Sequence, residues 1–319
     1  MIILKLIFDF IIYLIFLIFI SIFKILPSKI KLKFSEFLGL LLYYLIPKGR
    51  KLSLKNLKLI LNEQYKYNLT EKQIKYGFDY YHKDETQLKS VVEVSQYEGE
   101  DRLMINCTQL DAPYSAKDKK RILQEWCDFL VEHPDTFTEL MFCTRMPQEL
   151  FDTVCAQRRL KKLHIKWGVY PDISKLVNLQ ELEYLHIGSG RSVLSLEPIS
   201  RLVNLVALSI ENFQQIDDYA PLANLKHLES LALEGDFAAP KILKVQSLEF
   251  LRHMKQLRFF SFLTAKVIDK DYSPVLELNN LEHLTLKSCK EVKQLYPEFV
   301  KLPKLKYGTV LERPELYEK

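Results

Sequence analysis

The sequence predicts an α/β solenoid joined to an apolar N-terminal anchor. A hydrophobic pattern recurs about every 23 residues from residue 137 onward, and residues 6–23 form an apolar run whose single charge is Asp9. The chain has 319 residues and a net charge of +5, of which +9 falls within residues 1–75 and −4 within the rest. A basic first quarter indicates contact with a membrane or another polyanion at that end of the chain.

The repeat is the strongest signal. The pattern L-x-x-L-x-L, with other apolar residues at some positions, begins eight times at intervals of 22–29 residues: at Phe137, Leu160, Leu182, Leu205, Leu228, Leu257, Leu281 and Leu305. The last apolar residues of each unit alternate with polar ones, as in a β-strand. One such strand cannot bury its apolar side alone, whereas stacked units form a parallel sheet over a continuous core. The period is typical of a leucine-rich repeat solenoid, so we expect eight repeats in residues 137–319, with the sheet on the concave face.

The segments between these strands should lie on the convex side as short helices or 3₁₀ turns. Pro198, Pro221 and Pro274 suit the first turns of such segments. The longest unit, of 29 residues, contains the stretch 247–257, which predicts a fuller helix. Repeats of this kind commonly carry Asn or Cys three residues after the last strand leucine. Here Cys289 alone matches, so the backbone groups of the turns must find other hydrogen-bond partners.

A cap is predicted before the repeats. Residues 77–96 read as a polar linker, and residues 97–136 as a cap with a strand at 102–110 and an amphipathic helix at 115–134. Ser115 is a plausible N-cap, with Asp118 three residues on. A helix over the open end of the first repeat keeps a solenoid soluble.

Residues 1–26 are predicted to form a transmembrane helix. An 18-residue helix spans about 27 Å, close to the roughly 30 Å hydrocarbon core of a bilayer. A cleaved signal peptide is the alternative, but no small-residue cleavage site follows the run. Four lysines follow the run against Lys5 alone before it, so the positive-inside bias predicts a single-pass protein of the bacterial inner membrane whose repeats face the cytoplasm. The expected membrane contacts here are Phe10, Phe16, Phe19, Lys24, Lys29, Lys31 and Lys33.

Residues 27–76 are basic and amphipathic. After Pro47, basic residues alternate with leucines, a pattern that suits an anionic lipid surface, with Lys48, Arg50 and Lys51 as the expected contacts. An ordinary solvated helix face is the alternative.

Residues 1–75 resemble the N-terminus of the bacterial lipid A biosynthesis (lauroyl/myristoyl) acyltransferases. The resemblance rests on Leu38-Gly39-Leu40, Tyr43-Tyr44, Pro47-Lys48, Arg50-Lys51 and Asn56-Leu57. It implies an H-x4-D/E motif, in which a histidine acts as general base. None of the seven histidines has an acid five residues on. A degenerate acyltransferase acting on a lipid A precursor, or a reading frame that joins two genes, therefore stands as an alternative to a non-catalytic interaction protein.

Residues 97–311 resemble bacterial leucine-rich repeat proteins of unassigned function, through QEWCDFL, MPQELFDTVC and LKKLHIKWGVYPDISKL. That resemblance adds no catalytic residues. Five cysteines without a CxxC pair fit a reducing compartment. The acidic balance of residues 76–319 argues against nucleic acid, and no phosphate loop or nucleophile motif occurs. We therefore predict no enzyme activity, cofactor or metal, and a protein partner of unknown identity.

The binding surface is predicted on the strand positions between the core leucines. Adjacent strands lie about 4.8 Å apart, so the side chains of neighbouring units should form patches. The expected contacts are a basic and aromatic patch, an acidic pair beside it and two further residues: Lys162, His164, Lys166, Tyr184 and His186; Glu211 and Glu234; His283 and Lys287. A plain solvated face is the alternative. His164 and His186 lack an evident third metal ligand.

Overall fold

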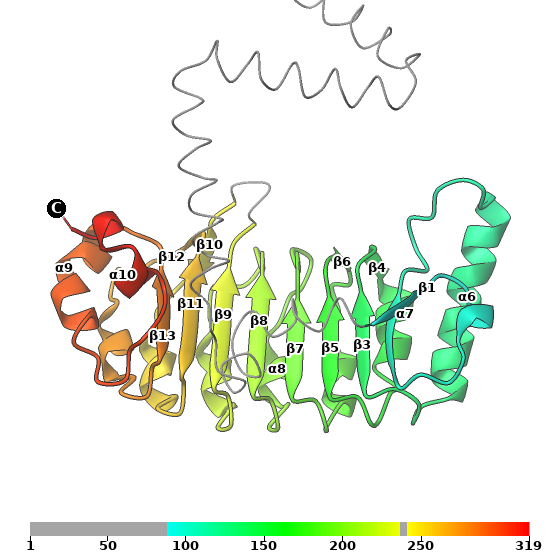
Figure 1. Cartoon of the computed structure of the whole chain (residues 1–319), viewed down its shortest axis with the longest axis horizontal. Helices are drawn as coiled ribbons and strands as arrows, with labels where there is room; N and C mark the ends of the chain where they lie inside the picture. The colour runs from blue at the N-terminus through cyan, green and yellow to red at the C-terminus, as the bar shows by residue number, and fades with distance from the viewer. Residues whose placement is uncertain (1–87, 237–240, 319) are drawn as a thin grey trace, which may run out of the picture. The chain divides into compact units, whose positions relative to one another are not determined.

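The computed structural model describes residues 88–236 and 241–318, which belong to the second of the chain's two units, Thr70–Lys319. These residues form a solenoid built on a nine-stranded sheet in which each strand runs parallel to its neighbours (Figure 1). The strands follow one another in chain order: β1 (Lys89–Val91), β2 (Arg102–Ile105), β3 (Glu139–Phe142), β5 (Lys162–Ile165), β7 (Tyr184–Ile187), β8 (Ala207–Glu211), β9 (Ser230–Glu234), β11 (Phe259–Leu263) and β13 (His283–Leu286). The predicted leucine-rich repeat architecture with a parallel sheet is confirmed.

The apolar residues of the repeat fill one core behind the sheet. The middle leucine or phenylalanine of each unit is buried and stands in register with its neighbours: Leu140, Leu163, Leu185, Leu208, Leu231, Phe260 and Leu284. Because side chains alternate along a strand, the residues between them point to the opposite side of the sheet. We call that side the concave face.

The N-terminal cap is larger than its predicted range. Ser115 is the N-cap of helix α6 (Ala116–Glu132). Its hydroxyl accepts a hydrogen bond from the backbone amide of Asp118, and the Asp118 carboxylate accepts one from the backbone amide of Ser115. The strand predicted at 102–110 ends at Ile105. Residues 89–96, assigned to the linker, contain β1 and the 3₁₀ turn η2 (Val94–Gln96), and the indole of Trp126 donates to the carbonyl of Val92 at 2.8 Å. The folded region therefore begins before Tyr97.

The prediction of eight repeat strands was wrong at the last unit. Tyr307 makes a single parallel bridge with His283, and the chain then turns at Gly308, whose φ is +99°, into helix α10 (Thr309–Glu312). Helix α9 (Lys290–Phe299), α10 and the 3₁₀ turn η7 (Pro314–Leu316) close this end of the sheet. The Tyr317 hydroxyl donates to the carbonyl of Leu286, so the eighth unit acts as a C-terminal cap.

The convex side carries short helical segments, as predicted. After α7 (Gln148–Val154) come η3 (Ser174–Asn178), α8 (Glu197–Ser200), η4 (Ala220–Asn224), η5 (Glu249–His253) and η6 (Ser273–Glu277). Each of the five begins in the same way: a side-chain oxygen accepts a hydrogen bond from the backbone amide two residues later. The five acceptors are Asp172, Ser195, Asp218, Ser247 and Asp271, with distances of 2.8–3.2 Å. This recurring cap was not among the features predicted from the sequence.

Backbone hydrogen bonds replace the missing asparagines in the turns after the strands. The amides of Gly190, Asn212 and Gly235 donate to the carbonyls of Glu211, Glu234 and Leu263 in the next unit, at 2.8–3.0 Å. Two short parallel pairs extend this flank: β4 (Met146–Pro147) with β6 (Gly168–Val169), and β10 (Leu243–Val245) with β12 (Ala265–Val267). In these three turns, backbone amides and carbonyls of neighbouring units bond to each other without the asparagine side chain common in such repeats.

The extra residues of the longest unit do not lengthen its helix. The stretch 247–257, predicted as a fuller helix, contains only the five-residue turn η5. The unit instead contains the short strand β10.

The predicted anchor and basic segment, residues 1–76, lie outside the described residues. Within 88–236 and 241–318, none of the helices combines the length and apolarity needed to cross a bilayer.

Candidate functional site: the concave face

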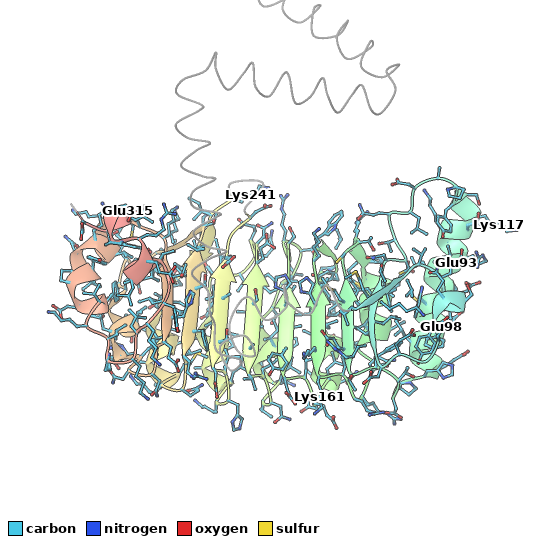
Figure 2. The ribbon with its side chains drawn as sticks, in the orientation of Figure 1. Glu93, Glu98, Lys117, Lys161, Lys241 and Glu315 are labelled. Atoms are coloured by element: carbon cyan, nitrogen blue, oxygen red, sulfur yellow. The ribbon has the colours of Figure 1, made fainter. Side chains whose placement is uncertain are left out.

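The concave face is a set of lateral rows, one residue per strand. Figure 2 shows Lys161 at the edge where strands begin and Lys241 at the edge where they end. The first row across the sheet reads Arg102, Glu139, Lys162, Tyr184, Ala207, Ser230, Phe259 and His283. The second reads Met104, Met141, His164, His186, Ser209, Ala232, Ser261 and Thr285. Register thus brings Lys162, His164, Tyr184 and His186 together on β5 and β7.

The predicted basic patch is partly neutralised in the first row. The Glu139 carboxylate lies 2.7 Å from Nε of Arg102 and 3.6 Å from Nζ of Lys162. The same Lys162 ammonium lies 5.5 Å from the centre of the Tyr184 ring, within cation–π range. Lys162 is therefore engaged within the sheet before a partner arrives.

The two histidines of the second row stack on each other. Their ring centres are 4.3 Å apart and their planes 21° from parallel, and Nδ1 of His186 lies 3.0 Å from the Ser209 hydroxyl. At the far end of the sheet, Nε2 of His283 lies 2.9 Å from the Thr285 hydroxyl. These contacts fix the orientation of the rings.

Burial divides the predicted residues into two groups. His164 is 8% exposed and Tyr184 2%, which does not fit a plain solvated face at these positions. Lys162, His186, His283 and Lys287 are half-buried and Lys166 is exposed. The second group keeps surface that a partner can reach, whereas His164 and Tyr184 shape the face.

Glu211 and Glu234 face each other on adjacent strands, as predicted. Burial raises the pKa of Glu211, although the Ser189 amide opposes this by hydrogen bonding, and the like charges of Asp236 and Glu234 raise it further. Burial also raises the pKa of Glu234, opposed by the Ser261 hydroxyl, which donates to its carboxylate at 2.9 Å. This pair is thus an acidic patch that binds protons more readily than ordinary glutamates.

Several charged residues of the face and its edge were not predicted. The repeat alignment does place Glu139 on the concave face, next to Lys162. Arg102 pairs with Glu139 from β2, before the first repeat, so the alignment could not have found it. Arg258, at the edge where strands begin, lies between the carboxylates of Glu229 at 3.0 Å and Glu282 at 2.8 Å. Such pairing depends on which repeats are neighbours. An alignment of all units at the residue before each strand would have shown these charges side by side.

Metal ligation and the protonation of one buried thiol bear on the chemistry of the described part of the chain. Among the described residues, no group of three His, Cys, Asp or Glu side chains could hold a metal ion. Burial raises the pKa of Cys107 to about 12, and the nearby Cys127 thiol raises it further, so this sulfur stays protonated at neutral pH.

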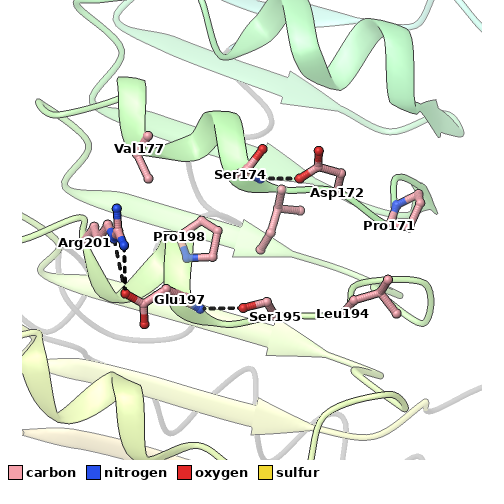
Figure 3. Close-up of a pocket in the computed structure, with 10 residues that line it drawn as sticks. Pro171, Asp172, Ser174, Val177, Leu194, Ser195, Glu197, Pro198 and Arg201 are labelled. Atoms are coloured by element: carbon pink, nitrogen blue, oxygen red, sulfur yellow. Dashed lines mark hydrogen bonds and ion pairs between the residues drawn. The ribbon is translucent and has the colours of Figure 1, made fainter.

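A depression of about 660 Å³ lies on the convex side between η3 and α8 (Figure 3). Leu194, which is 65% exposed, lines it together with Ile173 and Pro198. Its polar groups serve the local turns: Asp172 and Ser195 cap the two helical segments, and Glu197 accepts from Arg201 at 3.2 Å. The depression is therefore a seam between repeats.

No family model matches the chain, and no curated protein matches it. Solved structures do, and those described here are leucine-rich repeat proteins. An internalin (InlF) of Listeria monocytogenes is 18% identical over 54% of this chain, with a TM-score of 0.35. The corresponding values are 19%, 57% and 0.40 for internalin C2 of the same species, and 15%, 73% and 0.38 for a leucine-rich repeat protein of Leptospira interrogans.

The chain spans 61% of the first internalin, 72% of the second and 68% of the Leptospira protein. The fold assignment itself rests on the sheet topology and the repeat period described above.

Proposed function

We propose that this chain is a membrane-anchored, non-catalytic interaction protein, whose leucine-rich repeats bind a protein partner through the concave face. The observation that carries this proposal is the lateral register of β5, β7, β8 and β9, which places Lys162, His164 and His186 on the same face of the sheet as the acidic pair Glu211 and Glu234. A surface with both charges on fixed strands suits a partner with complementary charges. Solenoids commonly use such extended faces for binding.

The anchor is the second part of the proposal. The apolar run at residues 6–23 and the lysines after it support a single-pass protein of the bacterial inner membrane, with the repeats in the cytoplasm. The basic stretch around Lys48, Arg50 and Lys51 supports additional contact with anionic headgroups.

Proximity labelling of the full chain in cells tests the concave face. We expect Lys166→Glu with Lys287→Glu to remove specific proteins from the labelled set, because both lysines keep reachable surface. Lys119→Glu, on the exposed side of α6, is the matched control and should leave the set unchanged. An unchanged set in the concave variant, with the fold intact by circular dichroism, would refute this binding face.

Membrane fractionation tests the anchor separately. The full chain should remain with membranes after an alkaline carbonate wash, and a chain lacking residues 1–26 should be released. Release of the full chain would contradict the anchor and leave the concave-face test unaffected.

A further inference from the structure

The two-stranded ribbon β10–β12 joins the longest repeat unit to the unit after it. It arises in the 29-residue unit, whereas the other intervals are 22–24 residues. Insertions in solenoid repeats map to one face, often the one that binds. The ribbon is held firmly, because the amide of Gln246 donates to the Asp217 carbonyl at 2.7 Å and that of Leu243 to the Thr264 carbonyl at 2.9 Å.

The ribbon has an apolar inner side and a mixed outer side. Leu243, Val245, Ala265 and Val267 are buried in the core. On the outer side, Lys244 and Lys266 stand directly opposite each other in the register and both are exposed. Ile242 and Ile268, which flank them at the two ends of the ribbon, are 38% and 40% exposed.

The outer lysines lack acidic partners in the described part of the chain. No ion pair found there includes Lys244 or Lys266, although the convex cations of the same unit, Arg252 and Lys255, pair with Glu249 and Glu277. Like charges placed opposite each other on neighbouring strands destabilise a sheet. An anionic surface laid against the ribbon would remove that cost.

The acids that follow Lys266 in the sequence already accept backbone hydrogen bonds. The Asp269 carboxylate accepts a hydrogen bond from the backbone amide of Asp271 at 2.9 Å, and the Asp271 carboxylate accepts one from the backbone amide of Ser273 at 2.8 Å. The ribbon segments 241–246 and 264–271 carry four lysines and these two aspartates, so their balance is positive. Figure 2 shows Lys241 on the same flank.

We propose that the outer side of the β10–β12 ribbon rests on an anionic lipid surface, with Lys244 and Lys266 against headgroup phosphates and Ile242 and Ile268 at the acyl boundary. Two exposed isoleucines beside the lysines favour a lipid surface over a nucleic acid, which offers phosphates but no apolar layer. The proposal rests on the proposed membrane anchor, which brings the ribbon within reach of a bilayer. Such contact would fix how the concave face is presented to its partner.

Covalent labelling of lysines tests the contact. The full chain is reconstituted in phosphatidylcholine vesicles with and without phosphatidylglycerol, treated with an amine-acetylating reagent and analysed by mass spectrometry. We expect acetylation of Lys244 and Lys266 to fall about fivefold with phosphatidylglycerol, the factor that corresponds to roughly 1 kcal/mol for one lysine near anionic headgroups. High salt should reverse the protection. Lys117, exposed on α6, is the internal control.

A variant pair tests the isoleucines. Ile242→Ser with Ile268→Ser should weaken the protection, whereas Leu194→Ser, at an even more exposed leucine of the convex side, should not. Equal acetylation of Lys244 and Lys266 in both vesicle types would overturn the proposal, as would protection that the double variant retains in full. Flotation with neutral vesicles separates the two ideas: a chain that does not float lacks the anchor, whereas a floating chain with unprotected lysines lacks only the ribbon contact.

Discussion

The carboxylate of Glu139 on β3 lies 3.6 Å from the ammonium of Lys162 on β5, across one lateral step of the sheet. Arg102 approaches the same carboxylate from the other side, at 2.7 Å. Glu139 is thus a buried anion between two cations, and the first row of the concave face is charge-balanced at this end. The surface at this end is therefore an array of paired charges and not a purely positive patch.

Replacing Glu139 should reveal how much this array stabilises the sheet. We expect Glu139→Gln to lower the free energy of unfolding by about 1–3 kcal/mol, because two cations would then face each other beside a buried amide. Urea unfolding followed by tryptophan fluorescence measures the change, since both tryptophans of the sequence, Trp126 and Trp167, lie in the described unit. Glu183→Gln removes the more exposed pair with Lys161, 3.3 Å apart, and should cost less than about 1 kcal/mol. Equal losses would contradict this ranking.

The acidic pair predicts a dependence on pH. The pKa values of Glu211 and Glu234 are raised in the folded state, chiefly by burial. The folded chain therefore binds these protons more tightly than the unfolded chain, and its stability falls as the pH rises from the ordinary glutamate range, about 4.3, through the raised pKa. We expect Glu234→Gln to be more stable than the parent at neutral pH and to lose this advantage below about pH 4.

Urea unfolding of both proteins across this pH range checks the sign. Glu282→Gln is the opposite case, because burial raises the pKa of Glu282 but its hydrogen bond and ion pair with Arg258 lower it by more. That variant should lose stability at neutral pH. A difference between Glu234→Gln and the parent that stays constant with pH would show that the Glu234 carboxyl does not titrate differently on folding.

The side-chain caps of the convex helical segments should contribute to stability. Asp218 accepts the amide of Ala220 at 2.9 Å at the start of η4. We expect Asp218→Ala to lower the free energy of unfolding by about 1 kcal/mol and Asp218→Asn, which keeps an acceptor oxygen, to lower it by much less. Asp217→Ala is the neighbouring control and should be close to neutral. A similar loss in the alanine and asparagine variants would argue against the hydrogen bond as the cause.

The sequence was sufficient to predict the elements that depend on periodicity. The leucines at strand positions predict the parallel sheet because a strand with one apolar side must stack, and Ser115 with Asp118 predicts the start of α6. The recurring caps at Asp172, Ser195 and Asp218 left a signal at the repeat period, but short polar residues also occur in loops without capping anything.

The remaining features depend on contacts between units. Lys162 reads as part of a basic patch until Glu139 is placed on the adjacent strand, and the burial of Tyr184 is a tertiary property. The 29-residue unit was interpreted as a longer helix because its apolar spacing allows one. Pairing of Leu243–Val245 with the next unit instead used the extra residues as a strand. The sequence could therefore predict which residues lie on the concave face, but not which of them are buried or paired with a neighbouring strand.

Gly308 lies where the repeat array gives way to the C-terminal cap. Gly308 has a φ of +99°, and a Cβ built there would lie 2.2 Å from the backbone carbonyl oxygen of Leu284 on the last strand. Gly308→Ala therefore combines backbone strain with overlap against a strand that cannot move aside, and we expect a loss of at least about 3 kcal/mol. Gly99→Ala is the matched control, since Gly99 has a φ of +104° but no atom within 4 Å of the added carbon. It should lose only about 1–2 kcal/mol, the strain alone. Urea unfolding measures both variants, and hydrogen exchange should show faster opening of α10 in Gly308→Ala. Equal losses in the two variants would mean that overlap with Leu284 adds nothing to the backbone strain.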